Sequence, residues 1–146
     1  MIIPIQKIEL PVPGMERLLA EAREEGYDFV ETLVEDWASA ENRFDAPGEA
    51  LCGHLEEGLL LAVGGLNLDP FAGRPDIGRL RRVYVRPAWR NRGIGRALVT
   101  ALVEQARRNF RCVRLRAENA DAARLYESMG FSPIQSPDAT HILFFD

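Results

Sequence analysis

The sequence predicts one α/β (α+β) domain, in which a single sheet carries helices on its faces. Three observations lead to this fold class. The length of 146 residues corresponds to one domain of ordinary size, covering residues 1–146. A composition of 47% apolar and 27% charged residues is typical of a soluble globular chain and not of a disordered one. Strand-like and helix-like segments follow one another without an internal repeat or a long linker.

The first half of the chain is expected to form one strand, two helices and a hairpin. Apolar side chains recur at helical spacing in both expected helices, and Gly26 ends the first of them. The stretch 56–58 ends in glycine and separates two apolar runs, which is the pattern of a hairpin. The expected strands are 2–10, 50–55 and 59–68, and the expected helices are 14–25 and 28–40.

The second half is expected to alternate strands and helices. The most regular helical pattern has an apolar stripe that includes Ile94, Leu98 and Leu102. A shorter helix has Asn119 as its N-cap and Gly130 as its C-terminal stop. The expected strands are 80–85, 112–117, 131–134 and 141–145, and the expected helices are 92–108 and 120–129.

The net charge of −4 is distributed unevenly along the chain. Residues 1–70 hold 4 basic and 15 acidic side chains, whereas residues 71–146 hold 14 arginines and 7 acidic side chains. The acidic half could attract a cation and the basic half an anion. The alternative is that the two halves neutralise each other, and charge alone does not decide between the two.

The sequence also excludes several classes of protein. Cys52 and Cys112 have neither a metal-binding nor a disulfide spacing, so both are expected to be small core residues. No run of 18 apolar residues indicates a membrane span. The N-terminus lacks the pattern of a signal peptide, so the cytoplasm is the expected compartment.

The most informative stretch is VYVRPAWRNRGIGR, residues 83–96. A strand ends at Val85, and a turn with two glycines leads directly into the long helix. The first backbone N–H groups of a helix have no internal partner and carry the positive end of its dipole, so they can bind an anion. Gly93 and Gly95 let the anion approach without a Cβ in the way. Three arginines around this turn can bind phosphate oxygens: Arg90, Arg92 and Arg96.

Two common phosphate-binding motifs do not fit this loop. A P-loop requires a lysine after its glycines, and Lys7 is the only lysine in the chain. A dinucleotide fingerprint requires a third glycine where Leu98 stands, and an acidic residue about 20 positions later. A solvated, arginine-rich helix start, whose glycines only shape a turn, remains as the alternative.

The loop and the last helix together resemble the GNAT superfamily of acyl-CoA-dependent N-acetyltransferases. Residues 90–95, RNRGIG, fit the family pattern Arg/Gln-x-x-Gly-x-Gly/Ala, and residues 119–131, NADAARLYESMGF, resemble its closing motif. The resemblance covers about residues 80–134. It implies a mixed, mostly antiparallel sheet of six to seven strands, about four helices, and a bulged strand before the pyrophosphate loop. Leu80 and Val83 agree with a bulge, because both can face the core only if the alternation slips once.

The resemblance also implies acetyl-CoA as the cosubstrate, with acetyl as the default acyl group and no metal. Main-chain groups of Val83 and Val85 would pair with the pantetheine arm as if it were an added strand. Backbone amides of the glycine turn would hold the pyrophosphate, and Asn119 would contact the pantetheine arm. The residues implied for the cofactor are Val83, Val85, Arg90, Asn91, Arg92, Gly93, Ile94, Gly95, Arg96 and Asn119.

Tyr126 is the catalytic residue that the resemblance implies. By position alone it would be a buried aromatic residue of the last helix. In the family, a tyrosine at this place donates a hydrogen bond or a proton to the departing CoA thiolate. Transfer from a phenol of pKa near 10 to a thiol near 8.5 is uphill by roughly 2 kcal/mol. A strong hydrogen bond in a dry site can supply that stabilisation.

The group that accepts the proton of the amine is left open by the sequence. Acyl transfer needs a neutral amine, and many family members place a glutamate where this chain has Arg79. His54 is an alternative base. We expect direct attack by a small cationic amine without an acyl-cysteine intermediate. Acidic residues of the first two helices would attract this amine: Glu24, Glu25, Asp28, Glu31, Glu35 and Asp36.

Two other functions stay open. The fold could bind acyl-CoA without catalysis, as a sensor or assembly module, since the strand glutamate is absent. The arginines of the second half could bind nucleic acid, but stacking aromatic residues are not interleaved with them and the chain is acidic overall. Neither nucleic acid nor a membrane is therefore expected as a partner, and the expected assembly is a monomer or a homodimer.

Overall fold

A seven-stranded sheet in the order β1-β2-β3-β4-β5-β7-β6 forms the centre of the computed structural model, which describes residues 2–145. Neighbouring strands are antiparallel except for β4 and β5, which are parallel. The predicted mixed α/β class is confirmed. The strands are β1 Gln6–Lys7, β2 Ala50–Glu56, β3 Leu59–Leu68, β4 Ile77–Val85, β5 Cys112–Leu115, β6 Ser132–Pro133 and β7 His141–Phe144. The helices are α1 Met15–Glu24, α2 Phe29–Ser39, α3 Ile94–Asn109 and α4 Ala120–Ser128, with a 3₁₀ turn at Pro87–Trp89.

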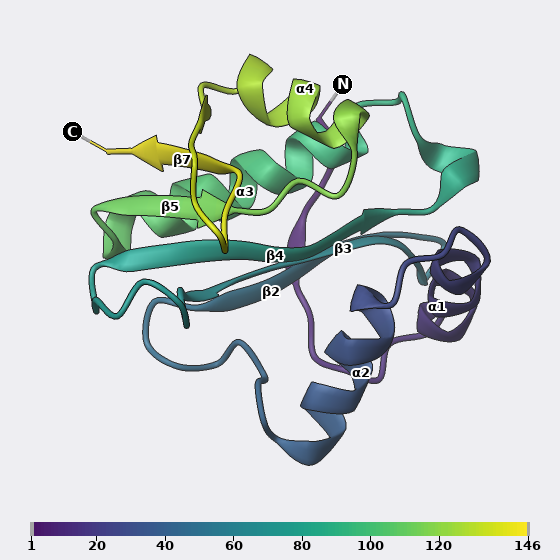
Figure 1. Ribbon diagram of the computed structural model, residues 1–146. Helices are drawn as coiled ribbons and strands as arrows, with labels where there is room; N and C mark the ends of the chain where they lie inside the picture. Colours follow the sequence, from purple (N-terminus) through teal and green to yellow (C-terminus); the bar gives the residue numbers. More distant parts are fainter. Residues whose placement is uncertain (1, 146) are drawn as a thin grey trace.

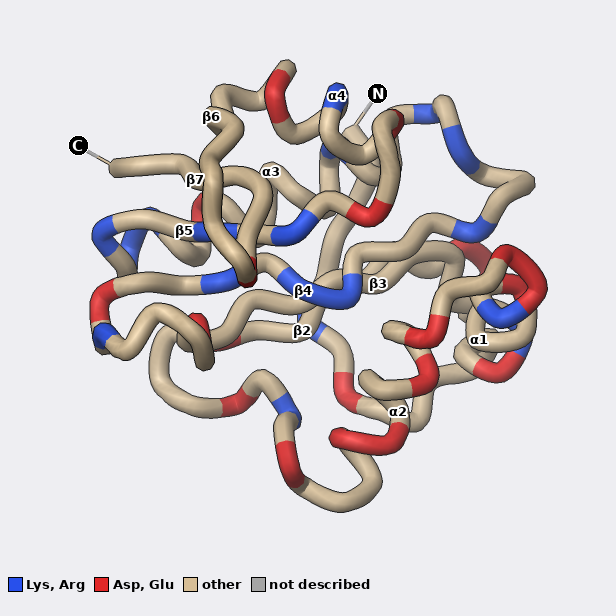
Figure 2. Tube along the Cα trace, viewed as in Figure 1, with Lys and Arg blue, Asp and Glu red and all other residues tan. Residues whose placement is uncertain are grey.

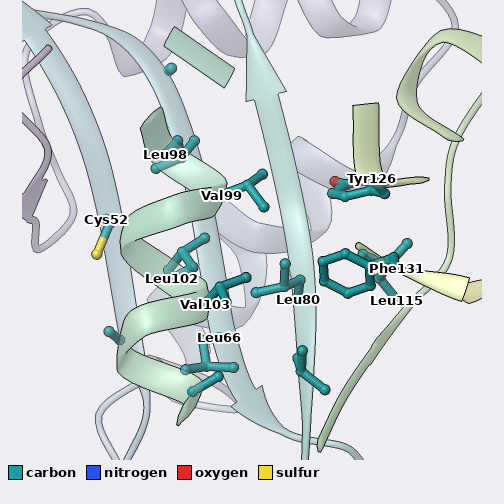
Figure 3. Close-up of a cluster of buried hydrophobic side chains, with 14 of the residues drawn as sticks. Cys52, Leu66, Leu80, Leu98, Val99, Leu102, Val103, Leu115, Tyr126 and Phe131 are labelled. Atoms are coloured by element: carbon teal, nitrogen blue, oxygen red, sulfur yellow. The ribbon is translucent and has the colours of Figure 1, made fainter. Parts of the chain in front are cut away.

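Helices cover both faces of the sheet, with α1 and α2 on one face and α3 and α4 on the other (Figure 1). Each face has its own apolar core. Leu98 of α3 packs with Leu66 of β3 in the first core, part of which Figure 3 shows. Leu18 of α1 and Leu33 of α2 pack with Val63 in the second core. All five side chains are fully buried, so removal of apolar surface from water stabilises both layers.

The ends of some elements differ from those that the sequence predicted. β1 contains only Gln6–Lys7 instead of residues 2–10, because its ladder with β2 comprises these two residues. β4 begins at Ile77, three residues earlier than predicted. The 3₁₀ turn Pro87–Trp89 was not predicted, and a proline at its first position suits a helical start.

A bulge in β4 shapes the region that follows. Val63 of β3 pairs with Tyr84, and Gly65 pairs with Arg81, so β4 has one extra residue between these two pairs. Arg82, at the bulge, has a φ of 60°. The predicted bulge before the glycine turn is therefore confirmed, and it changes the direction of the side chains on both sides of it.

β4 and β5 are paired over a short stretch only. Their parallel pairing ends at Arg79 and Arg114, whereas β4 continues to Val85. Figure 1 shows the chain after β5 turning away from β4 to reach α4. Within residues 2–145, no strand lies beside the second half of β4 on the β5 side. Its main-chain groups are open to another partner there, apart from the carbonyl oxygen of Val85, which accepts a hydrogen bond from Nε of Arg90.

A buried ion cluster ties the loop after β3 to β4 and β5. One carboxylate oxygen of the fully buried Asp69 accepts hydrogen bonds from Arg79 (3.3 Å) and Arg114 (2.9 Å). The other oxygen accepts from the backbone N–H groups of Phe71 (2.8 Å) and Ala72 (3.1 Å). Burial raises the pKa of this carboxyl group, but the hydrogen bonds and the two guanidinium charges outweigh burial, and the resulting pKa lies below its usual value.

We expect Asp69→Asn to lower the free energy of unfolding by about 3 kcal/mol, because two guanidinium groups lose their buried counter-charge. Since folding lowers the pKa of Asp69, its stabilisation is complete above the unfolded pKa of about 4 and is lost as the pH falls through the folded value. Urea unfolding at neutral and at acidic pH measures both effects. Asp76→Asn, which removes an exposed ion pair with Arg74, is the control. Equal losses of stability in the two variants would contradict this role of Asp69.

The acidic and basic halves of the chain neutralise each other beside the sheet. Glu21 of α1 binds Arg86 through two hydrogen bonds of 2.7 and 2.9 Å. Glu25 binds Arg90 in the same way, at 2.6 and 2.8 Å. Figure 2 shows acidic residues gathered on α1 and α2, and basic residues along β4 and the loop that follows it. Of the two interpretations of the charge pattern, mutual neutralisation is the better supported.

Candidate active site

A cleft of about 570 Å³ lies between the end of β4, the N-terminus of α3 and α4. The fold brings together here two motifs that are remote in the sequence. The resemblance implied ten residues for the cofactor and Tyr126 for catalysis. Nine of these eleven line the cleft: Val83, Val85, Arg90, Asn91, Gly93, Gly95, Arg96, Asn119 and Tyr126.

The N-terminus of α3 forms one end of the cleft. Gly93, the residue before the helix, has a φ of 87°, in the left-handed region that favours glycine. The amides of the first turn, from Ile94 onwards, have no acceptor within the helix. A Cβ at Gly95 would lie 3.6 Å from Val85 and 3.7 Å from Leu125, which both line the cleft. Its absence leaves space in which an anion can reach these amides.

Two arginines near the turn, Arg90 in the loop and Arg96 in α3, are bonded to other residues of the protein. Arg90 is bonded to Glu25, and its Nε donates to the carbonyl oxygen of Val85 (2.9 Å). Arg96 donates to Oγ of Ser128 (2.8 Å). Arg90 therefore holds the loop against α1, and the backbone amides of α3 are left as the main donors for an anion.

Of the residues implied for the cofactor, Arg92 and Ile94 do not line the cleft. Arg92 is exposed, and Ile94 is buried in the core beneath α3. Both belong to the turn itself, so their predicted contribution to phosphate binding is restricted to the main chain.

Asn119 links the walls of the cleft. Its Oδ1 accepts from the backbone N–H of Ala122 (2.8 Å), which confirms that it caps α4. Its Nδ2 donates to the hydroxyl oxygen of Tyr27, in the connection between α1 and α2 (2.8 Å). Because Tyr27 also lines the cleft, Asn119 joins elements that cover opposite faces of the sheet. Its contact with a pantetheine arm stays a prediction.

Tyr126 lies on the buried side of α4, where it is 6% exposed. Its ring packs edge-to-face against Phe131, with ring centroids 5.6 Å apart. Figure 3 shows its hydroxyl group pointing towards β4. Burial, and to a lesser extent the charge of Glu118, raise the pKa of this hydroxyl. The group therefore stays protonated and can act as a donor.

A smaller cavity of about 210 Å³ adjoins the cleft. Four residues line both spaces and are called the junction: Phe29, Val83, Glu118 and Tyr126. The other walls come from the loop after β3, from β4 and from the residue after β5, namely Phe71, Arg79, Leu80, Arg81, Arg82 and Arg116. A molecule in the cleft and a molecule in the small cavity would meet at the junction.

Glu118 is a candidate that the sequence reasoning missed. It lies between β5 and α4 and lines both spaces. Desolvation raises the pKa of its carboxyl group, although the charges of Arg82 and Arg116 act in the opposite direction. A carboxylate of raised pKa is suited to accept a proton from an ammonium group. The signal available in the sequence was its place directly before Asn119 of the closing motif.

His54 and Arg79 are bonded to other residues of the protein away from the junction. His54 is buried in β2 and is bonded to the carbonyl oxygen of Pro4 (2.8 Å) and to the carboxylate of Glu56 (3.0 Å). It lies outside both spaces. Arg79, at the position where many family members have glutamate, is bonded to Asp69 as described above. Neither is placed to take a proton from a substrate.

The acidic residues that were expected to attract an amine line neither space. Glu31 pairs with Arg23 at 2.7 Å, and a carboxylate oxygen of Asp36 lies 4.0 Å from Arg82. The residues concerned are Glu24, Glu25, Asp28, Glu31, Glu35 and Asp36. Any direct contact with an ammonium group at the junction therefore falls to Glu118.

In residues 2–145, no group of three or more His, Cys, Asp or Glu side chains is placed to hold a metal ion. The helices of this part of the chain are all too short or too polar to cross a bilayer. Cys52 and Cys112 are buried and unpaired, as core residues would be.

Comparison with known protein sequences points to one family. Residues 15–131 match the model of the acetyltransferase (GNAT) family. The L-methionine sulfoximine/L-methionine sulfone acetyltransferase of Salmonella typhimurium is 40% identical over 53 residues. This match spans 34% of the present chain and 31% of that protein, so about a third of the relative's length is represented.

Solved structures share the fold over nearly the whole chain. A provisionally assigned acetyltransferase from Exiguobacterium sp. 255-15 is 29% identical with a TM-score of 0.88, and 99% of this chain and 94% of that chain are covered. The PaiA N-acetyltransferase of Thermoplasma acidophilum, solved in complex with coenzyme A, has a TM-score of 0.67 over 99% of this chain and 100% of its own. At 18% identity, this second likeness concerns the fold alone.

Proposed function

Because this chain belongs to the acetyltransferase (GNAT) family, it is an acyl-CoA-dependent acetyltransferase, and we propose that it acetylates a small primary amine by direct attack on acetyl-CoA. The observation that carries this proposal is the junction. There, a cleft that begins at the amides of α3 meets a second cavity beside a buried tyrosine hydroxyl.

The cleft offers the groups that acetyl-CoA requires. The first-turn amides of α3, reached across Gly95, suit the pyrophosphate. The open edge of β4 at Val83 and Val85 suits the amides of the pantetheine arm, which can pair with it like an added strand. Asn119 borders the same path from the opposite wall. Acetyl-CoA supplies an activated acetyl carbonyl to the junction.

Two side chains of the junction handle the protons in this proposal. Glu118 takes a proton from the ammonium group, and the neutral nitrogen attacks the acetyl carbonyl. As the C–N bond forms and the C–S bond breaks, Tyr126 donates a hydrogen bond or its proton to the departing sulfur. The proton that the nitrogen loses on becoming an amide balances this step, so that CoA leaves as the thiol and the tyrosine ends protonated. Burial raises the pKa of the thiols of Cys52 and Cys112, which disfavours a thiolate nucleophile and supports direct attack.

An acceptor that is cationic in solution suits this arrangement. The carboxylate of Glu118 lines both spaces and can attract the ammonium group before it takes its proton. The acidic residues of α1 and α2 give less support to a cationic acceptor, because Glu21 and Glu25 are already paired with arginines.

Release of CoA thiol from acetyl-CoA, measured with a panel of primary amines, tests the reaction. We expect amine-dependent release in the wild type, together with an N-acetylated product detected by mass spectrometry. Direct attack predicts intersecting double-reciprocal plots, whereas a covalent acetyl-enzyme predicts parallel ones. Binding of acetyl-CoA without turnover of any amine would favour the non-catalytic sensor or assembly module instead.

We expect Glu118→Gln to lower kcat by about 10- to 100-fold, because the amine loses its proton acceptor. In the wild type, kcat/KM should rise with pH through a pKa above that of an ordinary glutamate, since the carboxylate must be unprotonated. This rise of kcat/KM with pH should be missing in Glu118→Gln. Glu104→Gln, at an exposed position of α3, is the control. A variant that keeps both the wild-type rate and the wild-type pH profile would overturn the role of Glu118.

Other properties of the chain remain predictions. We propose that residues 1–146 form one domain that works in the cytoplasm as a monomer or homodimer, without a nucleic-acid or membrane partner. Light scattering coupled to size-exclusion chromatography distinguishes the two assembly states.

A further inference from the structure

The small cavity carries an excess of positive charge that the proposed reaction does not use. Its lining contains one carboxylate, that of Glu118, and four arginines: Arg79, Arg81, Arg82 and Arg116. Two of these arginines have protein partners. Arg79 is bonded to Asp69 and donates to the carbonyl oxygen of Asp138 (2.6 Å), and Arg116 donates to the carbonyl oxygen of Pro137 (2.6 Å). Within residues 2–145, Arg81 and Arg82 are therefore the two arginines of this lining whose guanidinium groups donate no hydrogen bond.

Arg81 and Arg82 are adjacent cations without an adequate counter-charge. In the described part of the chain, Arg81 makes no hydrogen bond or ion pair through its guanidinium group, and burial together with the charge of Arg82 lowers its pKa to about 10. Nε of Arg82 is buried without a hydrogen-bond partner, and the carboxylate of Asp36 lies 4.0 Å from Nη2 of the same side chain. Burial also lowers the pKa of Arg82.

The bulge in β4 is what places this pair at one cavity. In a regular strand, consecutive side chains point to opposite faces of the sheet. The extra residue of β4, with Arg82 at a φ of 60°, interrupts that alternation, and both arginines line the same space. Figure 2 shows the middle of β4 as a basic stretch. Two desolvated like charges repel each other, which destabilises the folded chain unless an anion binds between them.

We propose that Arg81 and Arg82 bind the carboxylate of an amino-acid acceptor, whose amino group then lies at the junction beside Glu118. This inference rests on the proposed acetyl transfer and names its substrate class. Guanidinium groups bind carboxylates through paired, charge-assisted hydrogen bonds. The arginine pair and the carboxylate of Glu118 line one small cavity, and these opposite charges match a zwitterion.

The remaining walls and the size of the cavity fit the same class of molecule. Phe29, Phe71 and Leu80 provide apolar surface for the carbon skeleton of an amino acid. Cζ of Arg79 lies 4.8 Å from the centroid of the Phe71 ring. This cation–π contact holds the ring at the wall of the cavity. A space of about 210 Å³ is smaller than typical pockets for drug-sized ligands, which favours a single small acceptor.

Matched acceptors test the proposal. The twenty L-amino acids are assayed with acetyl-CoA, and the best of them is compared with its amide and with its decarboxylated amine. We expect kcat/KM of the acid to exceed that of both analogues at least about tenfold. Arg81→Gln and Arg82→Gln should each raise KM for the acid about tenfold or more, and should lower the ratio of kcat/KM for the acid to kcat/KM for the amide about tenfold.

A second readout separates a binding role from a structural one. Arg81→Gln removes an unpaired, partly desolvated charge, so its melting temperature should equal or exceed that of the wild type. An arginine with only a structural role would lower the melting temperature when replaced. Arg108→Gln, at the exposed end of α3, removes the same charge away from both spaces and is the control.

The outcomes separate this inference from the proposed function. Equal kcat/KM for acid, amide and amine, or equal losses with all three acceptors in the variants, would overturn the carboxylate site and leave acetyl transfer standing. If no amine is acetylated, the proposed reaction is wrong, and a binding experiment then tests the carboxylate site by itself. N-acetyl-L-amino acids are then titrated calorimetrically into the wild type in the presence of CoA. Binding that both arginine variants lose supports the site, and absence of binding overturns it.

Discussion

Tyr126→Phe is expected to lower kcat for amine acetylation by about a hundredfold or more, because the departing CoA sulfur loses its donor in a dry site. Tyr126 is buried at the junction, and its raised pKa keeps the hydroxyl protonated. The substitution retains the ring and its contact with Phe131, so the fold should be preserved. Affinity for CoA should stay nearly unchanged, since the hydroxyl acts on the reacting sulfur.

Steady-state kinetics at saturating acetyl-CoA and calorimetric titration of CoA measure these two effects. Tyr27→Phe is the matched control, because it removes another tyrosine hydroxyl and alters the bond to Asn119 without touching the proposed proton donor. We expect it to affect the KM for acetyl-CoA more than kcat. A Tyr126→Phe variant with the wild-type kcat would exclude the tyrosine as the donor.

Gly95→Leu is expected to weaken the binding of CoA and acetyl-CoA by more than about a hundredfold. The new side chain would start between Val85 and Leu125, and it would extend into the cleft and block the path to the amides of α3. Loss of two charge-assisted hydrogen bonds to the pyrophosphate, at about 1.5–3 kcal/mol each, accounts for this magnitude. Leucine is a better helix former than glycine, so the stability of α3 should not fall.

Calorimetric titration of both ligands and thermal unfolding provide the two readouts for Gly95→Leu. Thr100→Leu places the same side chain at an exposed position of α3 that does not line the cleft, and it should bind CoA like the wild type. Retained affinity in Gly95→Leu would mean that the cleft is not the cofactor site, and the assignment of the glycine turn would then be wrong.

Most of the fold could be predicted from local patterns. The helices α1 to α4 and the strands β2 and β3 lie within a few residues of their predicted ranges. Apolar periodicity, the cap at Asn119 and the glycines around the helix ends act over a few neighbouring residues, so the sequence contains them directly. β1 was predicted too long because its length depends on pairing with β2, which no local pattern records.

The candidate site was predictable to the extent that it rests on motifs. Nine of the eleven residues that the resemblance implied for the cofactor and for catalysis line one cleft. Their roles in binding and catalysis stay predictions. The proposed proton acceptor was not predictable, because Glu118 belongs to no motif pattern and its raised pKa arises from desolvation in the folded chain. The ion-pair partners of Arg90 and of the acidic residues on α1 and α2 could not be predicted either, because pairs such as Glu25–Arg90 join residues 65 positions apart.

The sequence by itself determined the family resemblance, the order of the elements and the glycine turn before α3, because each depends on residue types at short spacing. The tertiary structure alone decided which charges are neutralised and which are not. Glu21 and Glu25 of the acidic half pair with arginines, whereas the bulge and the divergence of β4 from β5 leave Arg81 and Arg82 at one small cavity. Electrostatic partners are set by distance in space and by exclusion of water, and neither can be read from positions along the chain.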